Sequence, residues 1–166
     1  DLDASRLSRW WEMFEKSLTG FVINGLTRYQ ETKARTKLIP SLESASMASL
    51  GIIPEDRDLL AVTVAEIASH LNGRIISCGD NLDNLVKYFL VGGWTMDAGE
   101  MYYGLRKDKA TITRGDRPDM QMASLATPTA CLVATNGIEP IDYVIYEAQE
   151  QGIPIIVVES DTLTTM

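Results

Sequence analysis

The side chains with the most chemical potential follow an apolar run, Ala110–Thr113, in the second half of the chain. After Arg114 come Gly115, Asp116 and Arg117, and each brings a different property to a turn. Glycine lets the backbone bend sharply or approach a ligand closely. Aspartate can accept hydrogen bonds from N–H groups of the next turn, and the planar guanidinium of Arg117 suits a carboxylate or a phosphate. These residues are candidates for an anion-binding turn.

The same turn also has an interpretation that needs no ligand. Pro118 presets the backbone for the first residue of a helix. Arg117 would then pair with Asp119 or with a neighbouring loop, and the turn would serve only to begin that helix. The sequence leaves both interpretations open.

Polar residues follow two more apolar runs of the chain. They are Thr135, Asn136 and Gly137 after the run Ala130–Thr135, and Ser160 and Asp161 after the run Ile153–Val158. Asn-Gly favours positive φ, so a turn alone explains that pair, and Ser160 or Asp161 would cap a following helix.

The elements that position these residues alternate between strand and helix. The three apolar runs are separated by helical patterns, a short one after Pro118 and a longer one from Pro140 to about Gln151. Short buried strands alternating with helices indicate parallel βαβ units, and ligands in such sheets bind beyond the carboxyl ends of the strands. We therefore predict an α/β three-layer domain with a mainly parallel sheet and a crevice at the strand ends.

The preceding residues add further elements to this domain. Thr63 and Glu66 have the spacing of a capping box, which predicts a helix that ends at Asn72-Gly73. Strands are expected over Arg74–Cys78 and Leu85–Val91, and a helix from about Thr95 to Leu105. The charged connector that begins at Pro54 marks the boundary between a domain over 1–56 and a domain over 57–166.

In the first domain, the sequence pattern predicts an N-terminal amphipathic helix followed by a single strand–helix–strand unit. The strands are expected over Leu18–Ile23, ending at Asn24-Gly25, and over Leu50–Ile53, with a surface helix over Tyr29–Ser44. Such a unit has the size of one βαβ crossover and cannot bury both faces by itself. In the N-terminal helix over 1–18, Trp10 and Trp11 serve either as core or as an anchor on another surface.

Composition and motif content exclude several functional classes. A net charge of -8 and a pI near 4.6 argue against nucleic-acid binding, and no apolar run is long enough to span a membrane. The patterns GxxxxGK[ST], GxGxxG and GxSxG are absent. One histidine, His70, expected to be solvated, and two distant cysteines, Cys78 and Cys131, expected to be buried, offer neither a metal site nor a catalytic pair. We predict no catalytic residue, no metal and a cytoplasmic location.

The second domain resembles the DRTGG domain, which is named for an Asp-Arg pair and a Thr-Gly-Gly turn. Asp116 and Arg117 match the pair, and Thr135-Asn136-Gly137 matches the turn with its middle glycine replaced. The resemblance covers about residues 60–166. DRTGG domains also occur between CBS domains of regulated inorganic pyrophosphatases, which implies homodimerisation and nucleotide regulation rather than catalysis.

The first domain resembles the last crossover of a P-loop domain similar to dethiobiotin synthetase. Asn24 and Pro54 match positions that help to bind adenine in that family, so the resemblance implies a vestigial base-binding site. The phosphate-binding loop would lie upstream of Asp1, so this chain alone should not hydrolyse ATP. Long phosphate acetyltransferases combine both domains in their N-terminal regulatory half.

The function predicted is a non-catalytic regulatory and dimerisation module within a longer protein, with domains before and after it. It would sense a nucleotide or a small anionic metabolite, with an adenine nucleotide as the candidate cofactor and a second copy of the chain as partner. The predicted ligand-binding residues are Gly115, Asp116, Arg117, Thr135, Asn136, Gly137 and Asp161.

Two rival functions remain. One is a piece of an ATP-dependent enzyme of the dethiobiotin or cobyrinate amide synthesis type. The other is a ligand-free interface module, whose interface would be the Trp10/Trp11 helix and a methionine cluster. That cluster comprises Met96, Met101, Met120 and Met122.

Overall fold

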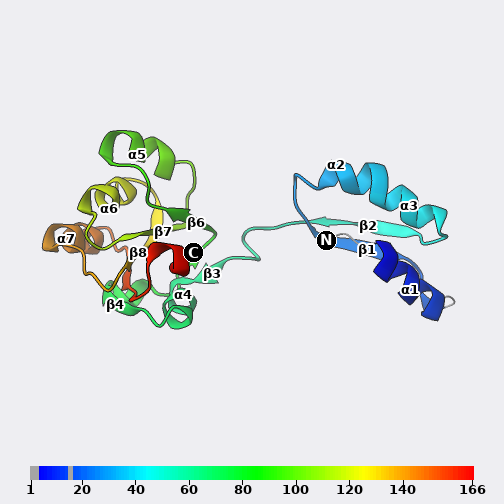
Figure 1. Ribbon diagram of the computed structural model, residues 1–166, viewed down its shortest axis with the longest axis horizontal. Coiled ribbons are helices and arrows are strands. Elements are labelled where there is room, and N and C mark those ends of the chain that lie inside the picture. The colour runs from blue at the N-terminus through cyan, green and yellow to red at the C-terminus, as the bar shows by residue number, and fades with distance from the viewer. Residues whose placement is uncertain (1–3, 15–16) are drawn as a thin grey trace. The chain divides into compact units, whose positions relative to one another are not determined.

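The chain divides into two compact units, Asp1–Asp56 and Arg57–Met166 (Figure 1). The computed structural model describes the backbone of residues 4–14 and 17–166, and the side chains of 9–14, 17–95 and 98–166. Each unit has its own sheet and its own hydrophobic core.

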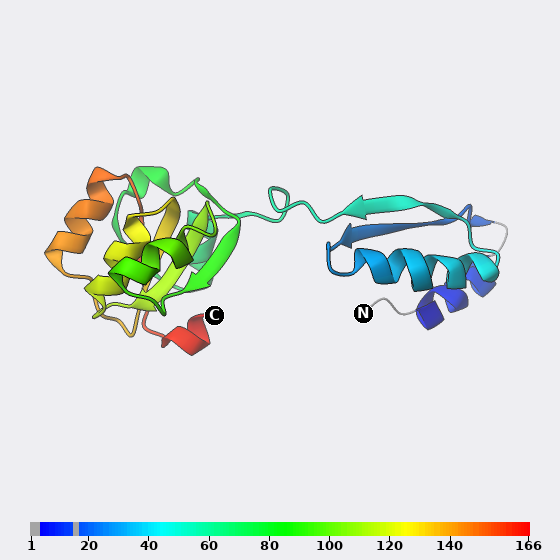
Figure 2. The ribbon, with the colours of Figure 1, turned by 90° about the horizontal axis from the view of Figure 1, so that it is seen from above.

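The first unit is a parallel two-stranded sheet with one helical crossover. Its elements are α1 (Ala4–Phe14), β1 (Phe21–Leu26), α2 (Glu31–Lys33), η2 (Ala34–Leu38), α3 (Ile39–Ser44) and β2 (Ser49–Pro54). Figure 2 shows the helical segment lying along both strands, where Ile23 and Leu26 of β1 pack on Ala34. Because β1 and β2 are parallel, the predicted strand–helix–strand unit is confirmed.

Two details of this unit differ from the sequence prediction. The first strand does not end at Asn24-Gly25, because Gly25, at φ 69°, accommodates a shift of register and the chain continues to the buried Leu26. The predicted helix contains a π-helical stretch, in which Ile39 N–H donates to Ala34 O. Pro40 follows, and its ring would clash with a carbonyl of a regular α-turn.

Apolar side chains of the first unit remain exposed. Val22 is 50% exposed and Leu50 60% exposed, so the unit leaves apolar strand surface uncovered, as expected for a lone crossover. In α1, Trp10 stacks on Phe14 with ring centroids 5.7 Å apart, and both are exposed. Core packing within the unit therefore does not account for Trp10.

The second unit carries the predicted three-layer architecture. Its elements are β3 (Val62–Thr63), α4 (Val64–His70), β4 (Arg74–Ser77), η3 (Gly79–Asn81), β5 (Leu85–Val86), β6 (Tyr88–Val91), α5 (Met96–Tyr103), β7 (Lys109–Arg114), α6 (Pro118–Leu125), β8 (Thr129–Thr135), α7 (Asp142–Glu150), β9 (Ile155–Val157) and α8 (Thr162–Thr165). The five-stranded sheet has the order β4-β9-β8-β7-β6, in which only the β4–β9 pairing is antiparallel. The predicted fold class is confirmed.

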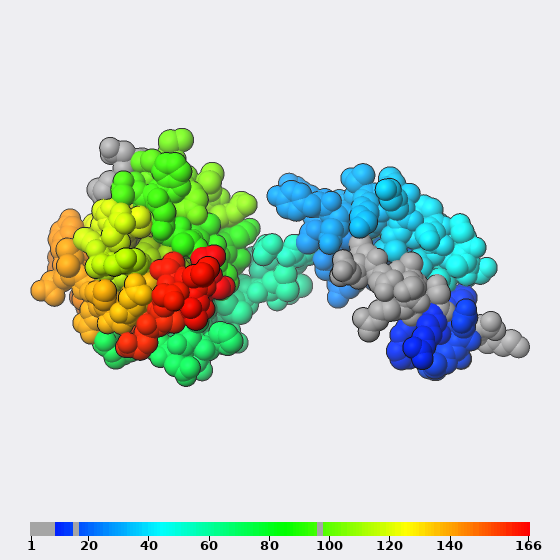
Figure 3. Space-filling view, viewed as in Figure 1, coloured from blue at the N-terminus to red at the C-terminus, as the bar shows by residue number. Residues whose placement is uncertain are grey.

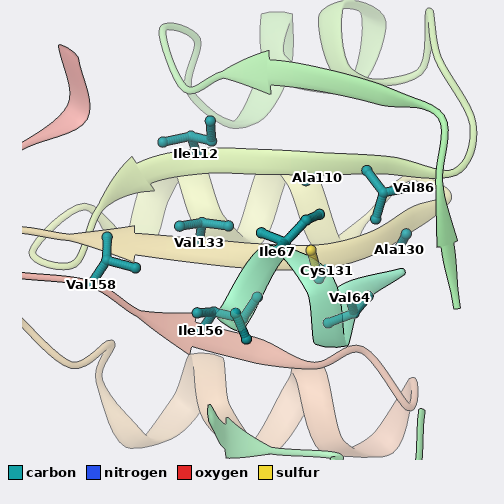
Figure 4. Packing of buried hydrophobic residues seen from close by; sticks show 11 residues of the cluster. Val64, Ile67, Val86, Ala110, Ile112, Ala130, Cys131, Val133, Ile156 and Val158 are labelled. Carbon is teal, nitrogen blue, oxygen red and sulfur yellow. The ribbon is translucent and has the colours of Figure 1, made fainter. Parts of the chain in front are cut away.

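Alternation along the strands divides the core between two faces of this sheet. On one face, Val64 and Ile67 of α4 pack on Ile112 of β7, Val133 of β8 and Ile156 of β9 (Figure 4). On the other face, residues of α6 and α7 cover Leu132 and Ile155. Neighbours in sequence point to opposite faces of a strand, so β8 and β9, covered on both, read as continuous apolar runs.

The run Leu85–Val91 is not one strand, as the sequence predicted, but two. β5 pairs antiparallel with β3, whereas β6 joins the edge of the main sheet beside β7. The break lies at Lys87, whose Nζ is 2.7 Å from Asp58 Oδ1 and 3.2 Å from Asp108 Oδ2. This tertiary contact is invisible in the hydropathy of the run.

The capping box that begins α4 is confirmed. Glu66 N–H donates to Thr63 Oγ1 over 3.1 Å, and Thr63 N–H donates to Glu66 Oε2 over 2.7 Å. The Glu66 carboxylate accepts from the backbone N–H and from the hydroxyl of Thr63, and these two hydrogen bonds, the backbone one first, lower the pKa of Glu66. The helix ends before Asn72, at φ 49°, and His70 is exposed as expected.

Both cysteines are free, and Cys131 is buried as the sequence predicts, whereas Cys78 is only partly buried. Cys131 is buried within the α4-side core, and this burial raises the pKa of its thiol to about 12. A thiol held in its neutral form is a small apolar side chain and a poor nucleophile.

A buried lysine fixes the C-terminal end of α6. Lys109 Nζ donates to Thr127 Oγ1 over 2.9 Å and to Pro128 O over 2.8 Å. Ser124 Oγ, in the last turn of α6, donates to Thr111 Oγ1 over 2.7 Å. Burial lowers the pKa of Lys109 to about 8, because it disfavours the charged amine.

This depressed pKa predicts a pH-dependent stability. Between about pH 8 and pH 10.5 the unfolded chain binds more protons at Lys109 than the folded chain, so the free energy of unfolding should rise with pH. Relative to Lys109→Met, wild type should gain up to about 3 kcal/mol over this range.

The measurement is urea unfolding from pH 7 to 10.5, followed by Trp94 fluorescence with Trp10 and Trp11 replaced by Phe. Groups that titrate alike in both proteins cancel in the difference. A difference between wild type and Lys109→Met that stays constant with pH would contradict the assignment.

Candidate functional site

Three polar turns meet at one edge of the main sheet, where β7, β8 and β9 end. Parallel strands bring their carboxyl ends to the same edge, and backbone hydrogen bonds tie these ends together. Gly115 N–H donates to Thr135 O over 3.2 Å, and Asn136 N–H donates to Ser160 O over 2.9 Å. The structure thus places the sequence-predicted residues of the second unit along one edge.

Two arginine–aspartate pairs dominate the turn after β7. Arg114 Nε and Nη2 donate to the Asp116 carboxylate over 3.0 and 2.6 Å. Arg117 Nε and Nη2 donate in the same way to the Asp119 carboxylate, over 3.0 and 2.8 Å. Each guanidinium therefore binds a carboxylate two residues further along the chain, with two N–H groups donating to its two oxygens. Asp116 and Arg117, the pair that suggested the family, do not bind each other.

These ion pairs set the protonation of the turn. The hydrogen bond from Arg114 lowers the pKa of Asp116, and the hydrogen bond from Arg117 lowers the pKa of Asp119. The Asp119 carboxylate in turn raises the pKa of Arg117. All of these groups are ionised at neutral pH, so the turn presents exposed charges of both signs.

The helix that follows is not capped by Asp116, contrary to the expectation that this carboxylate accepts from the next turn. The N-cap of α6 is Arg117, whose side chain makes no capping hydrogen bond, and Pro118 occupies the first turn as predicted. Asp116 is held by Arg114 instead, because a bidentate guanidinium contact competes with backbone N–H groups. The pairing of Arg117 with Asp119 agrees with the ligand-free interpretation of the turn.

Gly115 is buried against the loop that follows β8. A Cβ atom at this position would overlap the backbone carbonyl of Ile138. The glycine is needed for this close approach and not for an unusual φ, since its φ is not positive.

Gln121, which the sequence pattern did not mark as a site residue, donates hydrogen bonds to the backbone of the turn after β7. It is buried in α6, and its Nε2 donates to Arg114 O over 2.9 Å and to Gly115 O over 3.1 Å. Within the described part of the chain, its Oε1 has no hydrogen-bond partner. The signal in the sequence was an amide among apolar neighbours, one turn after Arg117.

Thr135 and Asp161 join the end of β8 to the C-terminal helix. Thr135 is fully buried, and its Oγ1 lies 2.9 Å from Thr162 Oγ1. Asp161 caps α8 as predicted, because Thr164 N–H donates to Asp161 Oδ1 over 2.8 Å. This hydrogen bond lowers the pKa of Asp161.

Asn136 and Gly137 form the expected positive-φ turn. Their φ angles are 67° and 64°, and Gly137 N–H donates to Val158 O over 2.8 Å. Asparagine tolerates this region of φ, which accounts for its presence where the family pattern has glycine. At Gly137 an added Cβ would also press on the Glu159 carboxylate, 2.5 Å away.

The arrangement presents guanidinium groups that are suited to binding an anion. Among the residues that the structure describes, no group of three His, Cys, Asp or Glu side chains could hold a metal ion. Arg114 and Arg117 have side chains 56% and 41% exposed, so both guanidinium groups are accessible to an anion. In the same described residues, no helix is long and apolar enough to cross a membrane.

Asn24 and Pro54, which the sequence predicts as vestigial base-binding residues, lie in the first unit. Asn24 is paired in register with Ile53, and Leu26 with Pro54, at the carboxyl ends of two parallel strands. Asn24 and Pro54 are both exposed. Asn24 thus lies within β1, and does not follow the strand as the sequence predicted, whereas Pro54 is the last residue of β2.

Comparison with known families identifies the second unit. Residues 66–166 match the DRTGG domain, and the chain belongs to this family. The chain is also 28% identical to phosphate acetyltransferase of Salmonella typhimurium and 27% identical to that of Escherichia coli, in each case over 90% of its length. Phosphate acetyltransferase of Synechocystis is 33% identical over 62% of the chain. The resemblance drawn from the Asp116-Arg117 and Thr135-Asn136-Gly137 motifs is confirmed.

The chain spans 24% of the length of the Salmonella and Escherichia relatives. Among solved structures, the chain is similar to the CBS and DRTGG domains of the regulatory region of Clostridium perfringens pyrophosphatase, complexed with the activator diadenosine tetraphosphate. That likeness has a TM-score of 0.56 at 16% identity, and covers 90% of this chain and 73% of the other. It supports the fold.

The close packing of Gly115 against Ile138 can be tested by substitution. Gly115→Ala should lower the free energy of unfolding of the second unit by about 2 kcal/mol, because its Cβ must displace backbone at Ile138. Gly93→Ala is the matched control, since nothing lies within 4 Å of a Cβ there, and should change stability by less than about 0.5 kcal/mol. Equal effects in urea unfolding would contradict the packing described.

Proposed function

We propose that this chain is a non-catalytic regulatory and dimerisation module of a larger cytoplasmic metabolic protein of phosphate acetyltransferase type. In this proposal the edge formed by the ends of β7, β8 and β9 senses a nucleotide or a small anionic metabolite. An adenine nucleotide is the candidate ligand, since the pyrophosphatase relative is complexed with diadenosine tetraphosphate as an activator. The similarity to phosphate acetyltransferases over 90% of the chain supports the parent class.

One observation carries the binding proposal: Arg117 is bound by Asp119, which belongs to its own turn. An exposed bidentate pair contributes little to stability, because water and salt screen it. A phosphate or carboxylate ligand can therefore replace Asp119 on Arg117 at small cost, and would then lie at the N-terminal end of α6. The net charge of -8 does not oppose this, since local donors outweigh distant charge.

The other predicted site residues take supporting roles in this proposal. Gly115 allows the turn to lie against the next loop, and Asp116 holds Arg114. Thr135 and Asp161 fix the end of β8 and the start of α8. Asn136 and Gly137 shape the neighbouring turn, where the exposed Asn136 side chain is available to a ligand.

The first unit is, in the same proposal, a remnant of a P-loop domain. Its parallel β1–β2 pair with a helical crossover supports this origin, and Asn24 and Pro54 would be its vestigial base-binding residues. The rival function, a piece of an ATP-dependent synthetase, requires a GxxxxGK[ST] loop in the residues upstream of Asp1.

A ligand-free interface module is the second candidate, because apolar residues are exposed around α5. Met101 is 80% exposed, Leu105 69% and Trp94 52%. Exposed apolar side chains that lie close together are typical of protein interfaces. Met120 and Met122 are half-buried, and the side chain of Met96 lies outside the described residues. Light scattering of wild type against Met101→Lys tests this surface, and an unchanged dimer would exclude it.

Arg117 and Asp119 provide a paired test of binding. Calorimetry against ATP, ADP, AMP, NADH, acetyl phosphate and pyruvate should identify a ligand. Asp119→Asn should raise the affinity for that ligand about tenfold by freeing the guanidinium, and Arg117→Ala should lower it about tenfold or more. The charge-matched controls, Asp142→Asn on α7 and Arg74→Ala on β4, should leave the affinity unchanged.

Two outcomes count against the proposal. Binding that survives Arg117→Ala undiminished would remove Arg117 from the site. Failure of all six compounds to bind would leave the interface function as the better account of the module.

A further inference from the structure

A separate cavity of about 550 Å³ lies on the α4 side of the main sheet. Its floor is formed by Ile67 of α4, Ile112 of β7 and Val133 of β8, and Phe89 of the edge strand β6 also lines it. The last residues of α8 complete the wall, and this helix lies at the surface, in red in Figure 3. The volume falls within the range of small-molecule sites, and an apolar floor is typical of them.

This cavity is distinct from the turn that carries Arg117. The residues of its floor belong to the core cluster between the sheet and α4. Arg117 begins α6, which packs on the opposite face of the same strands. The cavity and the turn therefore lie on different faces of the sheet. A ligand in the cavity does not require the anion site proposed at Arg117.

A few polar groups converge on the cavity from two helices. Glu66 and His70, one turn apart on α4, line the cavity together with Thr164 and Thr165 of α8. Thr63 N–H and Thr63 Oγ1 both donate to Glu66 Oε2, over 2.7 and 3.0 Å, which leaves Oε1 to accept from a ligand. These hydrogen bonds also lower the pKa of Glu66, so its carboxylate is ionised at neutral pH.

The residues that line the cavity disfavour the binding of an anionic ligand. Among the side chains that line the cavity, Glu66 is the one carboxylate, and none is an arginine or a lysine. An anionic ligand would meet this carboxylate with no arginine or lysine to offset the repulsion. A ligand with N–H donors would instead gain a charge-assisted hydrogen bond.

Phe89 favours a flat ligand. Its side chain is 55% exposed on the edge strand, next to the cavity floor. A planar ring could lie against this aromatic face and against the apolar floor, while its polar edge turns toward α4 and α8. Imidazole and hydroxyl groups both donate and accept hydrogen bonds, so they suit the mixed edge of a heterocycle.

We infer that this cavity binds a neutral, planar nitrogen heterocycle of nucleobase size, with its ring on Phe89 and an N–H group donating to Glu66. The cavity thus forms a second ligand site of the domain, of different charge preference from the turn at Arg117. Binding involves no covalent step.

A matched pair of ligands tests the inference on the full chain. 9-Methyladenine carries an exocyclic N–H donor, and 9-methylpurine is the same ring without it. Each is titrated into protein with labelled methyl groups, and the Ile67, Ile112 and Val133 signals report occupancy. 9-Methyladenine should give saturable shifts at these methyls and bind about tenfold more tightly than 9-methylpurine.

Two variants and their controls assign the contacts. Phe89→Ala should weaken both ligands about tenfold, whereas Tyr143→Ala, an exposed aromatic on α7, should change neither. Glu66→Gln keeps the capping-box geometry and should reduce the preference for 9-methyladenine to about threefold or less, whereas Glu150→Gln should preserve it. Arg117→Ala should leave both affinities unchanged.

Three results would overturn the inference. They are an absence of saturable methyl shifts with both compounds, equal affinities in wild type and Phe89→Ala, and shifts centred on Thr135 and Asn136. The last result would place the heterocycle at the strand ends.

Discussion

The parallel pairing of β7, β8 and β9 is the constraint on which the candidate site depends. Since parallel strands end at one edge, turns far apart in sequence become neighbours that hydrogen-bond to one another. Gly115 donates to the end of β8, and Asn136 donates to Ser160 beyond β9. Of the family motif residues, Thr135 accepts from Gly115 and Gly137 donates to Val158, so both take part in the hydrogen bonds of this edge. Arg117, whose carboxylate partner lies in its own turn, is the group that can exchange that partner for a ligand.

The two faces of the sheet offer different chemistry because side chains alternate along each strand. Ile112 of β7 lines the apolar cavity beside α4, whereas Thr111 faces α6 and accepts a hydrogen bond from Ser124. At the end of the same strand, Arg114 and Arg117 present positive charge. One strand thus contributes to an apolar cavity that carries a carboxylate and to a turn rich in guanidinium groups. α6 is fixed at both ends, by Gln121 and by Lys109.

Much of this architecture could be predicted from local patterns, and the rest depends on tertiary contacts. The parallel strands, the Thr63 capping box and the positive-φ turn at Asn136 follow from periodicity and intrinsic backbone preferences. The division of Leu85–Val91 at Lys87 does not, because two aspartates distant in sequence bind that side chain. The hydrogen bonds of Gln121 and the cavity beside α4 could not be predicted either, because residues distant in sequence form them in the folded domain. The apolar runs predicted that Gly115, Thr135 and Asp161 lie at strand ends, where the structure places them, whereas the ion pairs of Arg114 and Arg117 depend on side-chain geometry that the sequence does not show.

We propose that the ends of β7 and β8 form an anion site centred on Arg117. The most direct test is to map backbone amide shifts during a titration with ATP, in wild type and in Arg117→Ala. We expect saturable shifts concentrated at residues 115–119 and 135–137, which disappear in the variant. Saturable shifts elsewhere in the chain, or the same shifts in Arg117→Ala, would contradict this proposal.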